Sequence, residues 1–254
     1  MQDSAFDLPR YLAALPLFKD MSAEALQRIA AGSRLRRFER GAMAFHVGEP
    51  CVEFYVNVYG QIKLFALSTA GQEKVFELVG PGMSFAEAPM FVGGAHRVNA
   101  QALADTLLLA VGKQTVLDEI ARDPALAVRM LAGLSRRLHR LTADVEAYAL
   151  HSGLRRVVDY LLGELKQCAC SPNTLALPAS KATIALRLSL TPEYFSRVLH
   201  QLEAAGLIRI DKREISIPSP QCLQAFSSLG PDAPAPVCPR GQCVHWVATQ
   251  RAAA

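Results

Sequence analysis

The sequence predicts an α+β chain in which a compact antiparallel β fold, a long helix and a winged helix-turn-helix follow one another. Three patterns lead to this prediction. Short apolar runs punctuated by glycine fill residues 35–111, an apolar seam with helical spacing begins near residue 124, and two short helices with a hairpin fill residues 180–217. The expected parts are a sensor region at 1–123, a dimerisation helix at 124–150, a DNA-binding region at 151–228 and a disordered tail at 229–254.

The composition is that of a folded chain with two modest domains. Of 254 residues, 51% are hydrophobic and 20% are charged, and the net charge is +4, which permits a polyanionic partner. No run approaches the ~18 apolar residues of a membrane helix, and no signal sequence opens the chain. We therefore expect a cytoplasmic protein with no membrane partner, whose six cysteines are mainly reduced thiols.

The first third of the chain changes from helical to β character. Between Leu8 and Ala31 the pattern predicts short helices, with a cap at Asp20–Glu24 followed by apolar Leu26 and Ile29. From residue 35 onward, turn signals recur at glycines about every 8 to 12 residues, which is typical of a compact antiparallel β fold. The helices would cover this β fold.

A long helix follows, with apolar residues spaced alternately by four and three positions. Such a seam needs a partner surface, and pairing with a second copy of the chain is the simplest closed arrangement. The alternative is that the stripe packs only on its own β fold. The seam residues are Ala127, Leu131, Leu134, Leu138, Leu141, Val145 and Tyr148.

The helix that starts at Thr191 organises the last domain. Thr191 is suited to cap it, Pro192 to its first position and Gly206 to its end. A shorter helix precedes it at residues 180–188, and two alternating runs at 207–217 predict a hairpin wing. A plain surface helix pair is the alternative, but the order of cap, turn, arginine-bearing helix and wing favours DNA binding.

The exposed face of this helix carries groups that read base edges. Arg197 is suited to guanine, Glu193 to an amino group of cytosine or adenine, and Ser196 to a base edge or a thymine methyl. Basic side chains that neutralise DNA phosphates would supply affinity. In a two-fold symmetric dimer, the two recognition helices would lie one DNA turn, ~34 Å, apart on a palindromic site. Candidate backbone contacts are Thr191, Ser180, Lys181, Lys212 and Arg213.

The same residues carry a family resemblance. The run from Ser180-Lys181 through Leu190-Thr191-Pro192-Glu193, Ser196-Arg197-Val198-Leu199 and Gly206-Leu207-Ile208 resembles the CRP/FNR transcription regulators. Residues 71–76, 85–91 and 213–217 are similar to the branch of the dissimilative nitrate respiration regulator, DNR. The resemblance covers roughly residues 10 to 226.

The resemblance implies several properties that the residues alone do not show. It implies a β-roll of the cyclic-nucleotide-binding type, a homodimer in which an effector gates DNA binding, and RNA polymerase as a partner. Glu193, Ser196 and Arg197 match the family members that read TTGAT half-sites. Pro192 stands where cyclic-AMP-type members carry another arginine, which disfavours a TGTGA-type site.

For the effector, the DNR-like segments imply haem and, through its iron, nitric oxide. Haem needs an apolar slot and an axial ligand, and His46 and His96 on the β fold are the first candidates. An oxygen-sensing iron–sulfur cluster of the FNR type is not expected, because such clusters need an N-terminal group of cysteines and residues 1–50 contain none.

Cyclic AMP is the alternative effector. The family's phosphate cassette is matched at Glu87 and Arg97 but departs from the pattern at Ala86, which replaces a glycine, and at Val98, which replaces a serine. These changes remove room and a hydrogen-bond donor beside a phosphate, so they disfavour the nucleotide. A structural ion pair between Glu87 and Arg97 is the simpler interpretation.

The C-terminal tail and the search for catalytic residues give no strong indication of a further site. Cys238, Cys243 and His245 are weak candidates for a metal, haem or redox site, because their spacing is that of neither covalent haem nor a standard zinc site. No arrangement of residues indicates catalysis, so the chain is not expected to be an enzyme. The competing class is a ligand-sensing module that binds no DNA.

Overall fold

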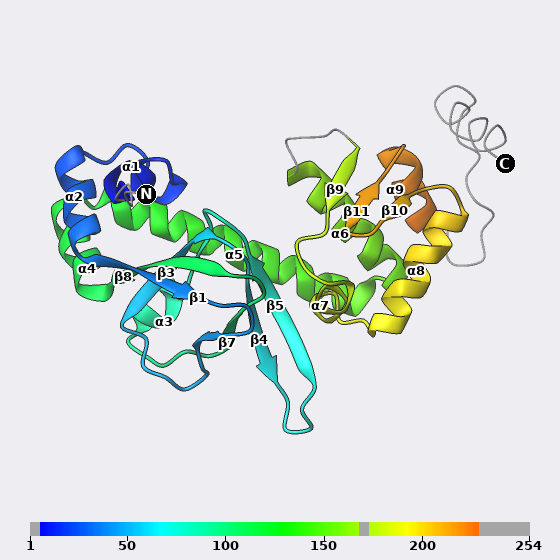
Figure 1. Cartoon of the computed structure of the whole chain (residues 1–254), viewed down its shortest axis with the longest axis horizontal. Coiled ribbons are helices and arrows are strands. Elements are labelled where there is room, and N and C mark those ends of the chain that lie inside the picture. The colour runs from blue at the N-terminus through cyan, green and yellow to red at the C-terminus, as the bar shows by residue number, and fades with distance from the viewer. Residues whose placement is uncertain (1–5, 168–172, 229–254) are drawn as a thin grey trace, which may run out of the picture. The chain divides into compact units, whose positions relative to one another are not determined.

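The computed structural model describes residues 6–167 and 173–228. The chain divides into two compact units, which we call the N-terminal body (within residues 1–143) and the C-terminal body (within residues 144–254) (Figure 1). The tail candidates Cys238, Cys243 and His245 lie outside the described residues.

The N-terminal body begins with short helices, as the sequence predicts. These are α1 (Leu8–Ala13), the 3₁₀ turn η1 (Pro16–Phe18) and α2 (Ala23–Ala31). Ser22 caps α2, because its side-chain oxygen accepts a hydrogen bond from the Ala25 N–H at 3.2 Å. Leu12, Phe18 and Ile29 from these helices are buried in the core of the body.

Two four-stranded antiparallel sheets form the β-roll. One has the order β1-β8-β3-β6 and the other β2-β7-β4-β5, and the β4–β5 hairpin extends beyond the rest of the roll (Figure 1). The antiparallel β fold expected at residues 35–111 is confirmed. The strands are β1 (Ser33–Phe38), β2 (Met43–Phe45), β3 (Glu53–Tyr59), β4 (Ile62–Leu67), β5 (Glu73–Val79), β6 (Ser84–Phe85), β7 (Asn99–Ala102) and β8 (Thr106–Gly112).

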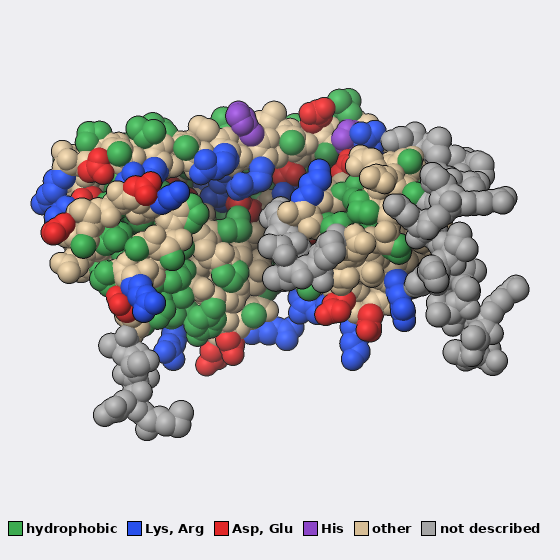
Figure 2. Space-filling view, turned by 90° about the horizontal axis from the view of Figure 1, so that it is seen from above, with side chains coloured by type: hydrophobic (Ala, Val, Ile, Leu, Met, Phe, Trp, Pro, Cys, Tyr) green, Lys and Arg blue, Asp and Glu red, His purple; other side chains and the backbone are tan. Residues whose placement is uncertain are grey.

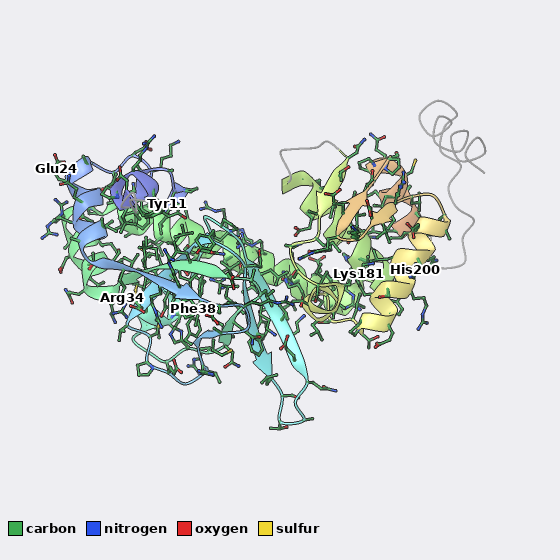
Figure 3. The ribbon with its side chains drawn as sticks, in the orientation of Figure 1. Tyr11, Glu24, Arg34, Phe38, Lys181 and His200 are labelled. Carbon is green, nitrogen blue, oxygen red and sulfur yellow. The ribbon has the colours of Figure 1, made fainter. Side chains whose placement is uncertain are left out.

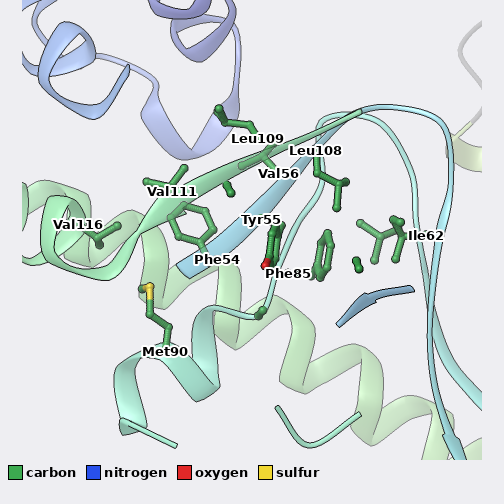
Figure 4. Packing of buried hydrophobic residues seen from close by; sticks show 14 of the residues in the cluster. Phe54, Tyr55, Val56, Ile62, Phe85, Met90, Leu108, Leu109, Val111 and Val116 are labelled. Carbon is green, nitrogen blue, oxygen red and sulfur yellow. The ribbon is translucent and has the colours of Figure 1, made fainter. Parts of the chain in front are cut away.

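Aromatic side chains fill the interior of the roll. The rings of Tyr55 and Phe85 stack with centroids 5.3 Å apart, and Phe54 and Phe85 are fully buried among aliphatic side chains (Figure 4). Each buried aromatic side chain removes a large apolar area from water and stabilises the fold. The roll therefore has a continuous core that holds its loops in place.

Three helices complete the N-terminal body: α3 (Glu87–Val92), α4 (Lys113–Arg122) and α5 (Ala125–Leu150). The Arg28 guanidinium of α2 donates to both carboxylate oxygens of Glu119 in α4, at 2.9 and 2.7 Å. Helix α5 buries Leu126 and Met130 in the core of this body. Its last residues, from Asp144, belong to the C-terminal body.

The C-terminal body is a winged helix-turn-helix with three strands. Its helices are α6 (Gly153–Gln167), α7 (Lys181–Arg187), α8 (Pro192–Ala204) and α9 (Pro220–Ser228). The strands β9 (Thr174–Ala176), β10 (Arg209–Asp211) and β11 (Glu214–Ser216) form one sheet in the order β10-β11-β9. The sequence predicts the hairpin and a short extended piece at residues 174–178, and this piece contains β9. It does not predict that β9 pairs with β11 of the hairpin.

The composition predicts that no helix spans a membrane and that the cysteines are mainly reduced. Within residues 6–167 and 173–228, no helix combines the length and the apolar character needed to cross a bilayer. The expectation of reduced cysteines holds at Cys51, a buried free thiol, and is wrong at Cys222, which is disulfide-bonded.

Candidate functional site

Helix α8 is built as its sequence predicts. The Thr191 hydroxyl accepts from the Tyr194 N–H at 3.2 Å, Pro192 occupies the first turn, and Gly206 adopts φ +70° after the last turn. The residues that pack against the rest of the body are all buried: Phe195, Val198, Leu199 and Leu202. The other side of the helix is left to the solvent.

Glu193, Ser196 and Arg197 share that solvent side. Glu193 and Arg197 are exposed and Ser196 is half-buried. Because successive helical residues turn by about 100°, the three side chains fall within roughly 100° of one another. The face that sequence reasoning assigned to base reading is therefore a single continuous surface.

Tyr194, which the helical pattern alone would place among the outward-facing residues, does not point freely into solvent. It is half-buried, and a Cβ added to Gly153 would lie only 2.4 Å from its Cε1. The Tyr194 ring therefore packs on the backbone at the start of α6, where only glycine fits. The Arg197 guanidinium carbon lies 5.9 Å from the ring centroid of Tyr194, a cation–π contact that helps to orient it.

Helix α7 presents the remaining candidates before the turn. The exposed Ser180 caps α7 by accepting from the Thr183 N–H at 3.1 Å, so its hydroxyl is already committed to the helix. Lys181 follows it and is half-buried. Figure 3 labels Lys181 on α7 and His200 on α8. Ser189 makes the turn between the two helices with φ +54°.

The wing places its two basic residues differently. Lys212 is exposed at the tip of the β10–β11 hairpin, where it adopts φ +53°. Arg213 is also exposed, but its Nη2 donates to the Leu177 carbonyl at 3.2 Å. Lys212 is thus the freer of the two cations for a phosphate.

The four effector candidates in the β-roll do not form one site. Glu87 is buried at the start of α3 and lies 3.6 Å from the Arg137 guanidinium of α5, whereas Arg97 is exposed. The alternative interpretation, an ion pair between Glu87 and Arg97, is wrong, because the basic partner of Glu87 is Arg137 of α5, 50 positions along the chain. Burial raises the pKa of Glu87, partly opposed by its hydrogen bond with Ser84.

The substitution at Ala86 keeps the backbone shape of the cassette. Ala86 adopts φ +70°, a left-handed conformation that glycine takes at no steric cost and that strains alanine. The chain therefore holds a glycine-type turn without glycine, and the methyl group of Ala86 is buried there.

The two candidate histidines lie in paired loops of the roll. His46 is exposed, with Nδ1 2.9 Å from the Glu49 carboxylate. His96 is buried and stacks flat on Phe45, with ring centroids 3.6 Å apart. Burial lowers the pKa of His96, which favours its neutral form.

Sequence reasoning missed the role of the arginines of α5. Arg137 contacts Glu87 and also pairs with Glu77 of β5, to which Arg140 donates at 3.2 Å. The spacing of the seam places Arg136, Arg137 and Arg140 on outer positions, which is the signal that was available. Their partners, which come from β5 and α3, follow only from the tertiary fold.

Two family models match this chain. Residues 35–123 match the cyclic nucleotide-binding domain, and residues 155–226 match the Crp-like helix-turn-helix domain. The first match covers the roll from β1 to the end of α4. The second contains α8, its exposed face and the wing.

Relatives of known name align over most of the chain. The cyclic AMP receptor protein of Thermus thermophilus is 28% identical over 80% of this chain and 92% of that protein. The structure of FixK2 from Bradyrhizobium japonicum, at 23% identity, covers 78% of this chain and 99% of its own with a TM-score of 0.71, which supports the fold. DNR from Pseudomonas aeruginosa is 34% identical over 85% of this chain and 96% of its own, with a TM-score of 0.46.

Proposed function

The chain belongs to the CRP/FNR family of DNA-binding transcription regulators, which are not enzymes, and from this premise we propose that it acts as a homodimer that reads a palindromic TTGAT-type site under the control of an effector. RNA polymerase is the proposed partner at the promoter. The observation that carries the DNA-reading part is the single solvent face of α8 that holds Glu193, Ser196 and Arg197.

In this proposal α8 reads the bases and the wing binds the phosphate backbone. The capped N-terminus of α8 enters the major groove, where Arg197 donates two hydrogen bonds to a guanine and Glu193 accepts one from an amino group. The exposed Lys212 at the hairpin tip binds a phosphate and adds affinity without adding sequence preference. The packing of Tyr194 on Gly153 fixes the rotation of α8 against α6.

The exposed stripe on α5 supports the homodimer. Five large apolar side chains on this helix are each more than 60% exposed: Val128, Leu131, Leu138, Val145 and Leu150. Leu131, Leu138 and Val145 repeat every seven residues, which keeps them on one side of the helix. An apolar stripe of this kind is costly in water, and a second copy of α5 would cover it.

For the effector, we propose haem with nitric oxide because residues 71–76 and 85–91 resemble the DNR branch. The two candidate histidines, His46 and His96, are poorly placed to be axial ligands of haem iron. His46 faces the solvent beside Glu49 and His96 lies flat on Phe45, and neither lines the cavity of about 490 Å³ in the N-terminal body.

Cyclic AMP is the alternative effector. It is favoured by the match of residues 35–123 to the cyclic nucleotide-binding domain and by the glycine-like backbone at Ala86. Against it stand the missing serine at Val98 and the engagement of Glu87 by Arg137, which leaves a ribose hydroxyl to compete with an arginine.

A gel-shift experiment tests the DNA-reading proposal. The full chain is titrated against a TTGAT-N4-ATCAA duplex and against the same duplex with both half-sites scrambled, in the presence and absence of haem, nitric oxide and cyclic AMP. We expect a shift of the intact duplex at protein concentrations that leave the scrambled one free. Equal binding to both duplexes, or to neither under every condition, would support the ligand-sensing module instead.

An absorption spectrum separates the two effectors. Protein purified with haem available is expected to show a Soret band that moves on addition of nitric oxide. A colourless protein whose melting temperature rises with cyclic AMP would overturn the haem proposal and support the alternative.

A further inference from the structure

Helix α8 carries a further titratable side chain that the proposed function does not use. His200 lies in the third turn of the helix, and its side chain is 75% exposed (Figure 3). The proposed base contacts, Glu193, Ser196 and Arg197, all come from the first two turns. An exposed histidine on a helix is by itself an ordinary surface residue, so its position relative to these three decides whether it can act with them.

Helical geometry places His200 on the same face as the proposed base contacts. At 100° per residue, His200 is turned by about 20° from Glu193 and by about 40° from Ser196, and it falls between them. At 1.5 Å per residue it lies roughly 4.5 Å beyond Arg197 along the axis. The buried residues of the helix lie on the opposite side, so His200 faces away from α6 and α7. A surface that presents the three contacts to a DNA groove therefore also presents His200.

The third turn of a recognition helix lies nearer to the edge of the groove than the first two. Such a helix enters the major groove with its N-terminal residues on the base edges. Residues further along it approach the sugar–phosphate backbone, which takes part in most of the hydrogen bonds between proteins and DNA. The position of His200 therefore suits a phosphate, to which an imidazole N–H can donate.

The charge of α8 makes the protonation state of His200 important. The helix contains two acidic residues, Glu193 and Glu203, and one permanent cation, Arg197. It therefore carries one net negative charge when His200 is neutral and none when His200 is protonated. On the face of the C-terminal body drawn in Figure 2, Lys and Arg side chains lie among Asp and Glu side chains. One added positive charge on α8 thus changes the local balance that a DNA backbone meets.

Glu203 is the charged neighbour of His200. Its Oε2 lies 4.0 Å from His200 Nδ1, and its Oε1 accepts a hydrogen bond from the Ile210 N–H of β10 at 2.9 Å, which holds the carboxylate in place. The charged side chains of β10, Arg209 and Asp211, are exposed and form no ion pair with His200 within the described part of the chain. The fixed carboxylate would repel a nearby phosphate, and a protonated imidazole between the two anions offsets that repulsion.

We propose that protonated His200 binds a DNA phosphate at the edge of the groove, so that DNA binding takes up a proton and tightens as the pH falls. Histidine is the side chain whose charge changes between about pH 5 and pH 8, and a nearby anion favours its charged form. The inference rests on the proposed DNA-reading function of α8 and adds a response to pH to it. The contact contributes affinity on any DNA sequence, because a phosphate carries no sequence information.

Fluorescence anisotropy of the full chain tests the proposal at about pH 6 and about pH 8 and at one fixed ionic strength. The probes are the TTGAT-N4-ATCAA duplex and its scrambled counterpart, under the effector condition that gives the gel shift. The key variants are His200→Gln, which is always neutral, and His200→Lys, which is always charged over this range. The matched control is His139→Gln, which removes another exposed histidine, on α5.

We expect wild type and His139→Gln to bind DNA at least about threefold more tightly at the lower pH. His200→Gln should bind with the weaker wild-type affinity at both pH values and His200→Lys with the stronger one, by the same factor on both duplexes.

The outcomes separate this inference from the function on which it rests. Equal pH dependence in wild type and His200→Gln, with the TTGAT duplex still preferred, would overturn the role of His200 and leave DNA reading intact. A loss in His200→Gln that is confined to the TTGAT duplex would assign the side chain to a base and overturn the phosphate contact. A wild type that binds neither duplex would overturn both proposals.

Discussion

At the scale of single residues, the pKa of Glu87 makes stability depend on pH. Its carboxyl is buried and burial raises its pKa above the ordinary value of 4.5. The folded protein therefore holds this proton more tightly than the unfolded chain does. The resulting stabilisation is complete below about pH 4.5 and is lost as the pH rises through the raised pKa.

We predict that Glu87→Gln removes this dependence, because an amide does not titrate. The free energy of unfolding of wild type, measured by urea denaturation, should fall relative to that of Glu87→Gln as the pH rises above about 4.5. The exposed Glu39→Gln is the control and should run parallel to wild type. A constant difference between wild type and Glu87→Gln at all pH values would contradict the prediction.

The two kinds of DNA contact should respond differently to mutation. Arg197→Ala should cost about 1–3 kcal/mol of binding free energy and relax the preference at one base position. Lys212→Ala should weaken intact and scrambled duplexes alike, because a phosphate contact carries no sequence information. Fluorescence anisotropy with single-base variants of the duplex measures both effects, and a uniform loss in Arg197→Ala would remove it from base reading.

Some of these residues could be assigned from the sequence and others could not. Thr191, Pro192 and Gly206 act on their own helix, so their local pattern is enough to place α8. The partner of Glu87 could not be assigned, because Arg137 meets it only after the roll and α5 have packed together. The left-handed backbone at Ala86 was hidden for another reason: alanine is not the residue that such a conformation favours.

At the scale of elements, the contact between α2 and α4 depends on an ion pair with the opposite response to pH. The Glu119 side chain is buried, and its hydrogen bonds from Arg28 lower its pKa below 4.5. The carboxylate therefore stabilises the fold above its ordinary pKa, and this contribution is lost as the pH falls through the lowered value.

We predict that Glu119→Gln lowers stability most at neutral pH. The difference in free energy of unfolding between wild type and Glu119→Gln should shrink as the pH falls below about 4.5, because the wild-type carboxyl then takes up a proton. Urea denaturation at several pH values checks this. A difference that grows on acidification would show that Glu119 is not held as a carboxylate.

Helix α5 should control the oligomeric state. Leu138→Glu places a charge in the centre of the exposed stripe, and burying two such charges at a two-fold axis should cost at least about 3 kcal/mol. We expect a dimer for wild type and a monomer for Leu138→Glu in sedimentation velocity. The adjacent His139→Glu is the control, since His139 is exposed away from the seam, and dissociation of that variant would argue against the seam.

The elements themselves were largely predictable because their signals are local. Alternating runs and glycine turns indicated the roll, and a heptad pattern indicated α5. The extended piece that contains β9 was predicted, but its pairing with β11 was not. Three residues carry no signal that names their partner strand. The cavity was equally hidden, because its walls are separated by more than 100 positions in the chain.

At the scale of the whole molecule, dimerisation and DNA reading should be coupled. Two linked recognition helices bind a palindrome with the gain of an intramolecular second contact, so wild type should prefer the full site to a half-site. In Leu138→Glu we predict that this preference falls by at least about tenfold while half-site affinity is unchanged. Fluorescence anisotropy with full-site and half-site duplexes measures this preference. An unaltered preference in Leu138→Glu would mean that the two chains dimerise through a surface other than the α5 seam.

The end of α5 is tied to α7 by side-chain contacts within the C-terminal body. Arg187 of α7 bonds the Asp144 carboxylate at 2.7 Å and the Tyr148 hydroxyl at 2.8 Å, so the last two turns of α5 are clamped to the first helix of the helix-turn-helix. Residues 144–150 of α5 should therefore follow α7 in any rearrangement of the C-terminal body.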